Sequence, residues 1–69
     1  MTRYIVEERP DGGWVVLRDG VVVLRNLRTR AGAEIMAERC ALDEASGAWS
    51  RLRILDDGSV EVRRNEDAS

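Results

Sequence analysis

Hydrophobic and polar positions do not alternate evenly in the segment from residue 14 to residue 24. Residues 14–17 and 21–24 are two blocks of four apolar residues, separated by Arg18-Asp19-Gly20. A half-buried strand alternates apolar and polar residues, because successive side chains point to opposite faces of the sheet. The two blocks therefore predict strands that are apolar on both faces. Asp19-Gly20 fits the two-residue type I′ turn of a hairpin between them.

The rest of the pattern predicts one helix and three further strands. Residues 4–8 are β-prone and predict the first strand, and the turn residues 10–13 follow it. Thr29 is a suitable N-cap for a helix over residues 30–45, with Gly47 at its C-terminal end. Residues 51–56 and 60–62 predict two more strands, joined by a turn at Asp57-Gly58. The expected fold is α+β, an antiparallel β-meander with one helix packed on one face, in the order βββαββ.

The short length of the chain limits how much core it can bury. The 69 residues predict one domain over 1–69, with an ordered core over 1–62 and a frayed polar tail over 63–69. Chains of this size bury only about 60% of their unfolded surface, and many are stabilised by disulfides, metal or self-association. Cys40 is the single cysteine and there is no histidine, so neither an internal disulfide nor a zinc site is expected. Self-association is the remaining device.

Pairing across the predicted hairpin separates its aliphatic side chains into two faces. With Asp19-Gly20 as the loop, Leu17 pairs with Val22 and Val15 with Leu24, and directly paired residues share a face. The helix can cover only the other face, through a stripe of small residues around Ala33 and Ala37. Strand alternation adds two residues to the uncovered face. The six aliphatic residues expected there are Ile5, Val15, Leu17, Val22, Leu24 and Leu55.

These six residues would form a patch of roughly several hundred Å², as large as the largest patch on a typical monomer. Burying each of them would contribute roughly 1.5–3 kcal/mol. We therefore expect a second copy, in a homodimer, or another protein to cover this face. The alternative is an internal cover, in which residues 47–56 or the tail fold over it.

Several short motifs follow one another along the chain: Tyr4, Val6, Gly12-Gly13-Trp14-Val15-Val16, Gly20, Thr29-Arg30-Ala31-Gly32-Ala33, Ala37, Ala41, Leu52-Arg53-Ile54 and Asp57-Gly58. This series resembles the pattern of a family of small bacterial proteins known as a domain of unknown function. The resemblance implies almost nothing about activity. It does imply which residues face the helix: Tyr4, Val6, Trp14, Val16, Leu52 and Ile54. The order of elements is also similar, more weakly, to the HicB-type antitoxin domain.

Candidate residues for catalysis are few. The commonest general base, histidine, is missing. Cys40 falls on the apolar stripe of the predicted helix and is expected to be a buried structural thiol. Asp56 and Asp57 are adjacent in a turn and lack the spacing of a calcium loop. We therefore expect no enzyme, no metal site, no cofactor and no small-molecule substrate.

The balance of charges indicates whether nucleic acid or a membrane is an expected partner. Eleven basic residues, all arginine, and 13 acidic residues give a net charge of −2, which disfavours a strong nucleic-acid or membrane binder. The leading hypothesis is a cytoplasmic, non-enzymatic module that self-associates or binds another protein. No membrane segment is expected. The alternative is a small nucleic-acid-associated regulator that uses the arginines of the sheet and the strand–helix junction. Those arginines are Arg25, Arg28, Arg30, Arg51 and Arg53.

Overall fold

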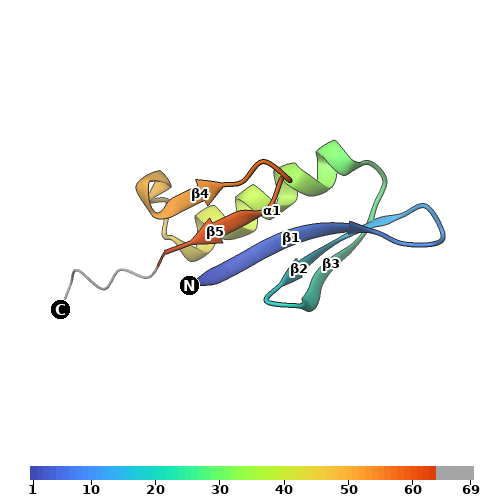
Figure 1. The fold of residues 1–69 in the computed structure, drawn as a ribbon, viewed down its shortest axis with the longest axis horizontal. Coiled ribbons are helices and arrows are strands. Elements are labelled where there is room, and N and C mark those ends of the chain that lie inside the picture. The colour runs from blue at the N-terminus through green and yellow to red at the C-terminus, as the bar shows by residue number, and fades with distance from the viewer. Residues whose placement is uncertain (64–69) are drawn as a thin grey trace.

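Five strands form one antiparallel sheet, and a single helix lies across one of its faces (Figure 1). This computed structural model describes residues 1–63. The elements in chain order are β1 (Thr2–Glu8), β2 (Trp14–Arg18), β3 (Val21–Leu27), α1 (Arg30–Glu44), the 3₁₀ turn η1 (Trp49–Arg51), β4 (Leu52–Ile54) and β5 (Val60–Val62). The sheet order is β3-β2-β1-β5-β4, so β1 is the central strand and β3 and β4 are the edges. The prediction of an α+β fold with the order βββαββ is confirmed.

The helix α1 begins and ends at the predicted signals. The Thr29 side chain accepts a 3.0 Å hydrogen bond from the backbone nitrogen of Gly32, which satisfies a donor that the first turn leaves unpaired. Gly47 has φ +81°, the left-handed conformation in which helices commonly end. Glu44 is the last helical residue, one before the predicted end.

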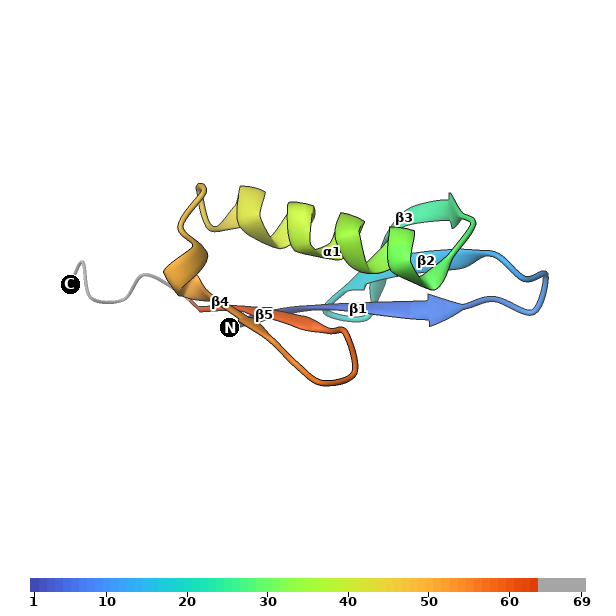
Figure 2. The same cartoon turned by 90° about the horizontal axis from the view of Figure 1, so that it is seen from above.

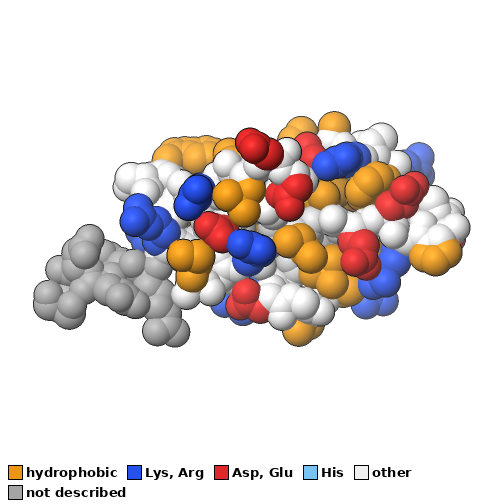
Figure 3. Space-filling view, viewed as in Figure 1, with side chains coloured by type: hydrophobic (Ala, Val, Ile, Leu, Met, Phe, Trp, Pro, Cys, Tyr) orange, Lys and Arg blue, Asp and Glu red, His pale blue; other side chains and the backbone are white. Residues whose placement is uncertain are grey.

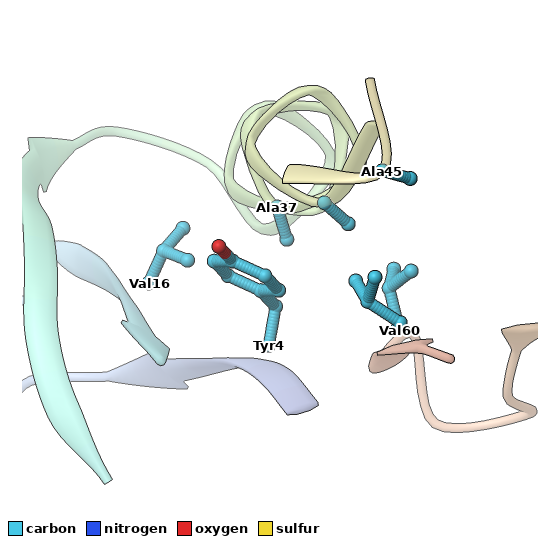
Figure 4. Packing of buried hydrophobic residues seen from close by; sticks show 7 residues of the cluster. Tyr4, Val16, Ala37, Ala45 and Val60 are labelled. Carbon is cyan, nitrogen blue, oxygen red and sulfur yellow. The ribbon is translucent and has the colours of Figure 1, made fainter. Parts of the chain in front are cut away.

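The core between α1 and the sheet is thin, because the helix presents mainly alanines to it. Every fourth position carries a buried alanine: Ala33, Ala37, Ala41 and Ala45. In Figure 4, Tyr4, Val16 and Val60 of the sheet lie beneath Ala37 and Ala45. Small residues on the contact face let the helix backbone lie close to the sheet. Consequently the largest side chains that are completely buried are only Val16 and Val60.

Some of the residues that the family resemblance assigns to the helix-facing side pack against the core, and others do not. Val6 and Leu52 are half-buried and pack against the core, as expected. Trp14 is half-buried but lies outside the core cluster, whose central aromatic residue is Tyr4. Ile54 is 55% exposed, because it lies on the short edge strand β4.

Two bulges shift the register of β3 against β2. Leu17 pairs with Val22 as predicted, but Leu24 pairs with Val16 instead of Val15, so β3 has one extra residue in this interval. A second shift follows before Leu27. The prediction that Leu24 lies on the outer face is therefore wrong. The bulge turns this side chain to the helix side, where it packs against the core cluster.

The segment after α1 widens the sheet and does not cover it. Residues 49–51 form η1, and β4 pairs edge to edge with β5. Figure 2 shows α1 on one side of the sheet and no second layer on the other. The alternative prediction, an internal cover by residues 47–56, is therefore wrong. The backbone nitrogen of Arg63 donates to the carbonyl oxygen of Arg51 at 2.8 Å, and residues 64–69 of the predicted tail lie outside the described residues.

Candidate interaction surface

The outer face of the sheet, opposite α1, carries an aliphatic row that crosses three strands. Ile5 of β1 pairs with Leu17 of β2, and Leu17 pairs with Val22 of β3. Val15 shares this face because it lies two residues from Leu17 on the same strand. The structure therefore brings together four of the six residues predicted for an interface. We call Ile5, Val15, Leu17 and Val22 the outer cluster.

The outer cluster is already partly buried in the single chain. Val15 is 4% exposed and Leu17 is 8% exposed, whereas Ile5 and Val22 are half-buried. No helix or strand of residues 1–63 lies over this face (Figure 2), so the low exposure of Val15 and Leu17 does not come from a second layer. The predicted aliphatic residues are thus not one continuous bare patch. A partner could still reach the cluster at Ile5 and Val22.

The other two predicted interface residues lie elsewhere. Leu24 is on the helix side of β3, as described above. Leu55 follows the end of β4 and lies half-buried in the β4–β5 turn, where its backbone nitrogen donates to the carbonyl oxygen of Ser59. Neither residue belongs to the outer cluster.

Charged residues border the outer cluster on two sides. On one side, Arg3 Nη2 and Glu61 Oε2 are 2.6 Å apart, and Glu61 also pairs across the sheet with Arg53. The Glu61 carboxylate raises the pKa of the Arg3 guanidinium, chiefly through this hydrogen bond. On the other side, Glu7 pairs with Val15 and its carboxylate lies 3.5 Å from Arg9. Figure 3 views the molecule from the sheet side and shows charges of both signs among hydrophobic side chains.

The five arginines of the nucleic-acid alternative do not gather on one surface. Arg25 lies on β3 and Arg53 on β4, which are opposite edges of the sheet. Arg28 lies between β3 and α1. The side chains of Arg30 and Arg51 both donate hydrogen bonds to acceptors within the chain. This arrangement lacks the continuous basic track that backbone phosphates would follow.

A polar cluster that the sequence did not reveal joins α1 to the sheet. The Tyr4 hydroxyl and Arg18 Nε both donate to Oε1 of Glu44, at 2.6 and 2.9 Å. Burial raises the pKa of Glu44, but the hydrogen bonds from Arg18 and Tyr4 outweigh it and lower the value from 4.5 to about 2. The pairing of β1 with β2 makes Tyr4 and Arg18 neighbours. Only the docked position of the helix shows that Glu44 meets them.

The remaining reactive groups offer little chemistry. Cys40 is half-buried on α1, and burial, with a smaller contribution from Asp43, raises the pKa of its thiol. A raised pKa keeps the thiol protonated at neutral pH and weakens it as a nucleophile. Within residues 1–63, no three cysteine or acidic side chains gather in a way that could hold a metal ion.

No helix in the described part of the chain is both long and apolar enough to cross a membrane.

Comparison of the chain with protein-family models, with curated proteins and with solved structures finds no match. The resemblance to a bacterial domain of unknown function, and the weaker one to the HicB-type antitoxin domain, therefore stay predictions. What can be proposed about function depends on the surfaces of this chain.

Proposed function

We propose that this chain is a small, non-catalytic protein-binding module that self-associates through its outer sheet face. The outer cluster supports this proposal: an aliphatic row crosses three strands on a face that no other element of residues 1–63 covers. Sheets that are apolar on both faces are typically covered on both. A second copy packed face to face would remove Ile5 and Val22 from water, in a chain whose own core is thin.

The charges along β1 favour a second copy as the occupant. On the outer face, Arg3, Ile5 and Glu7 follow one another as basic, aliphatic and acidic positions. A two-fold axis along the aliphatic row would place Ile5 against its own equivalent. It would also place Arg3 of each copy, which is paired with Glu61 of its own chain, opposite Glu7 of the other, so opposite charges meet across the axis.

The first test is the mass in solution, measured by sedimentation over a range up to high micromolar concentration. One chain has a mass of 7.8 kDa, and we expect a species of twice that mass. Val22→Thr should raise the dissociation constant by roughly tenfold, because it puts a hydroxyl into the contact on both copies. Val21→Thr is the matched control: this neighbour is 64% exposed and pairs with Arg18, whose side chain reaches α1 on the helix side.

A second pair of variants tests the charge arrangement. Glu7→Arg should weaken association at low salt by placing an arginine opposite Arg3 of the second copy, and salt should reduce the effect. Glu8→Arg is the control, because Glu8 pairs with Trp14 on the helix side of β1. Thermal unfolding must show that all four variants fold. A wild-type chain that stays at 7.8 kDa at high micromolar concentration would overturn the proposal.

A further inference from the structure

A groove opens at the end of the sheet where the β1–β2 loop approaches β3. Its volume is about 520 Å³, and its lining includes Arg9, Pro10, Trp14, Val15, Val22 and Arg25. This volume is within the range of about 300–1,000 Å³ that small-molecule sites occupy. The groove adjoins the outer cluster, because Val15 and Val22 belong to both. It is a feature that the hydrophobic pattern of the sequence did not predict.

The groove combines apolar walls with an excess of positive charge. The half-buried side chains of Val22 and Trp14 and the exposed Pro10 supply apolar surface, whereas Val15 is only 4% exposed. Arg25 forms no ion pair with any residue in the described part of the chain, so its guanidinium is available to an anion. Arg9 is held only loosely, 3.5 Å from the exposed Glu7.

One acidic residue, Asp11, also lines the groove. Its Oδ1 accepts a hydrogen bond of 2.9 Å from the backbone nitrogen of Gly13, which fixes the loop. Arg9 and Arg25 therefore outnumber the single carboxylate among the charged lining residues. In a chain with a net charge of −2, this is a local reversal of sign.

We propose that this groove binds a small amphipathic carboxylic acid. The carboxylate would pair with the planar guanidinium of Arg25, which suits bidentate recognition, with Arg9 as the second cation. The apolar part of the ligand would lie against Val22 and Trp14. Both features are needed, because an exposed arginine alone holds an anion weakly.

The test is an NMR titration of the full chain at a concentration where it is a single 7.8 kDa species. Benzoate is the probe, benzamide is its neutral counterpart, and inorganic phosphate carries charge without an apolar body. We expect benzoate to shift the amides of Gly13, Val15 and Asn26 and the Trp14 indole saturably, with a dissociation constant on the order of 1 mM. Benzamide and phosphate should each bind at least about fivefold more weakly.

Arg25→Gln should weaken benzoate binding about fivefold or more, since it removes the charge while keeping most of the side chain. Arg28→Gln is the matched control: Arg28 is three residues away, does not line this groove, and its loss should change the affinity less than about twofold. The proposal would be overturned if benzoate bound no more tightly than benzamide or phosphate. It would also be overturned if the two variants had equal effects on benzoate affinity, or if benzoate gave no saturable shift. Because Val22 belongs to both surfaces, a bound ligand and a second copy would compete for it; the titration is therefore read from the single chain, and its failure would leave the proposed self-association standing.

Discussion

The Tyr4 hydroxyl donates a 2.6 Å hydrogen bond to Oε1 of Glu44, and this bond joins the central strand to the last residue of α1. A carboxylate at the C-terminal end of a helix is unfavourable, because the helix dipole is negative there. Arg18 offsets this by donating to the same oxygen. The contact with two donors thus holds the helix end against the sheet, where the alanine-rich interface supplies little side-chain volume.

The first prediction is that this cluster makes stability sensitive to acid. The pKa of Glu44 in the folded chain, about 2, is below its ordinary value of 4.5. The contribution of Glu44 is therefore fully present above pH 4.5 and is lost as the pH falls toward 2. Urea unfolding at several pH values should show this loss in the wild type and in Glu38→Gln, a control on the same helix. In Glu44→Gln it should be reduced, and an unchanged acid loss would show that other groups cause it.

A second prediction concerns the alkaline side of the same hydrogen bond. Burial, followed by the hydrogen bond to Glu44, raises the pKa of Tyr4 from 10 to about 12. A raised pKa means that the stabilising effect is complete below pH 10 and disappears as the pH rises toward 12. Tyr4→Phe should cost about 1–3 kcal/mol at neutral pH, because it removes a hydrogen bond to a charged group. Ultraviolet titration of tyrosine, of which Tyr4 is the only one, measures this pKa directly.

Local signals in the sequence were sufficient for the elements but not for the faces. The cap at Thr29, the turn at Asp19-Gly20 and the alanine spacing each depend on a few neighbouring residues, so these features can be predicted from the sequence alone. The bulge before Leu24 arises from strand packing and has no comparable signature. For this reason a strict period of two assigned Leu24 to the wrong face.

The hydrophobic pattern of the sequence also could not predict how deeply the outer cluster is buried. Alternation correctly placed Ile5, Leu17 and Val22 in one row. It could not show that Val15 and Leu17 are already buried in the single chain, because their exposure depends on sheet twist and on where long neighbouring side chains lie. The groove beside the row depends on the same three-dimensional details.

The third prediction tests the second bulge at Asn26. Its φ of +65° is in the left-handed region, which asparagine and glycine adopt more readily than other residues. Asn26→Gly should leave the free energy of unfolding within about 0.5 kcal/mol. Asn26→Val should lower it by about 1–2 kcal/mol, because a β-branched side chain is strained there. Urea denaturation compares the two variants, and equal stabilities would mean that the bulge does not constrain this position.

The last prediction concerns the close approach of α1 to the sheet. Ala37 is completely buried above the core cluster, so no space is left for a larger side chain. Ala37→Leu should therefore destabilise the fold by about 1–3 kcal/mol through overpacking, although leucine is itself a good helix former. Ala31→Leu makes the same change at an exposed position of the same helix and should alter stability by less than about 0.5 kcal/mol. Chemical denaturation measures both variants. If Ala37→Leu were as stable as Ala31→Leu, the contact between α1 and the sheet would have room for a larger side chain. The helix would then not be held close to the sheet.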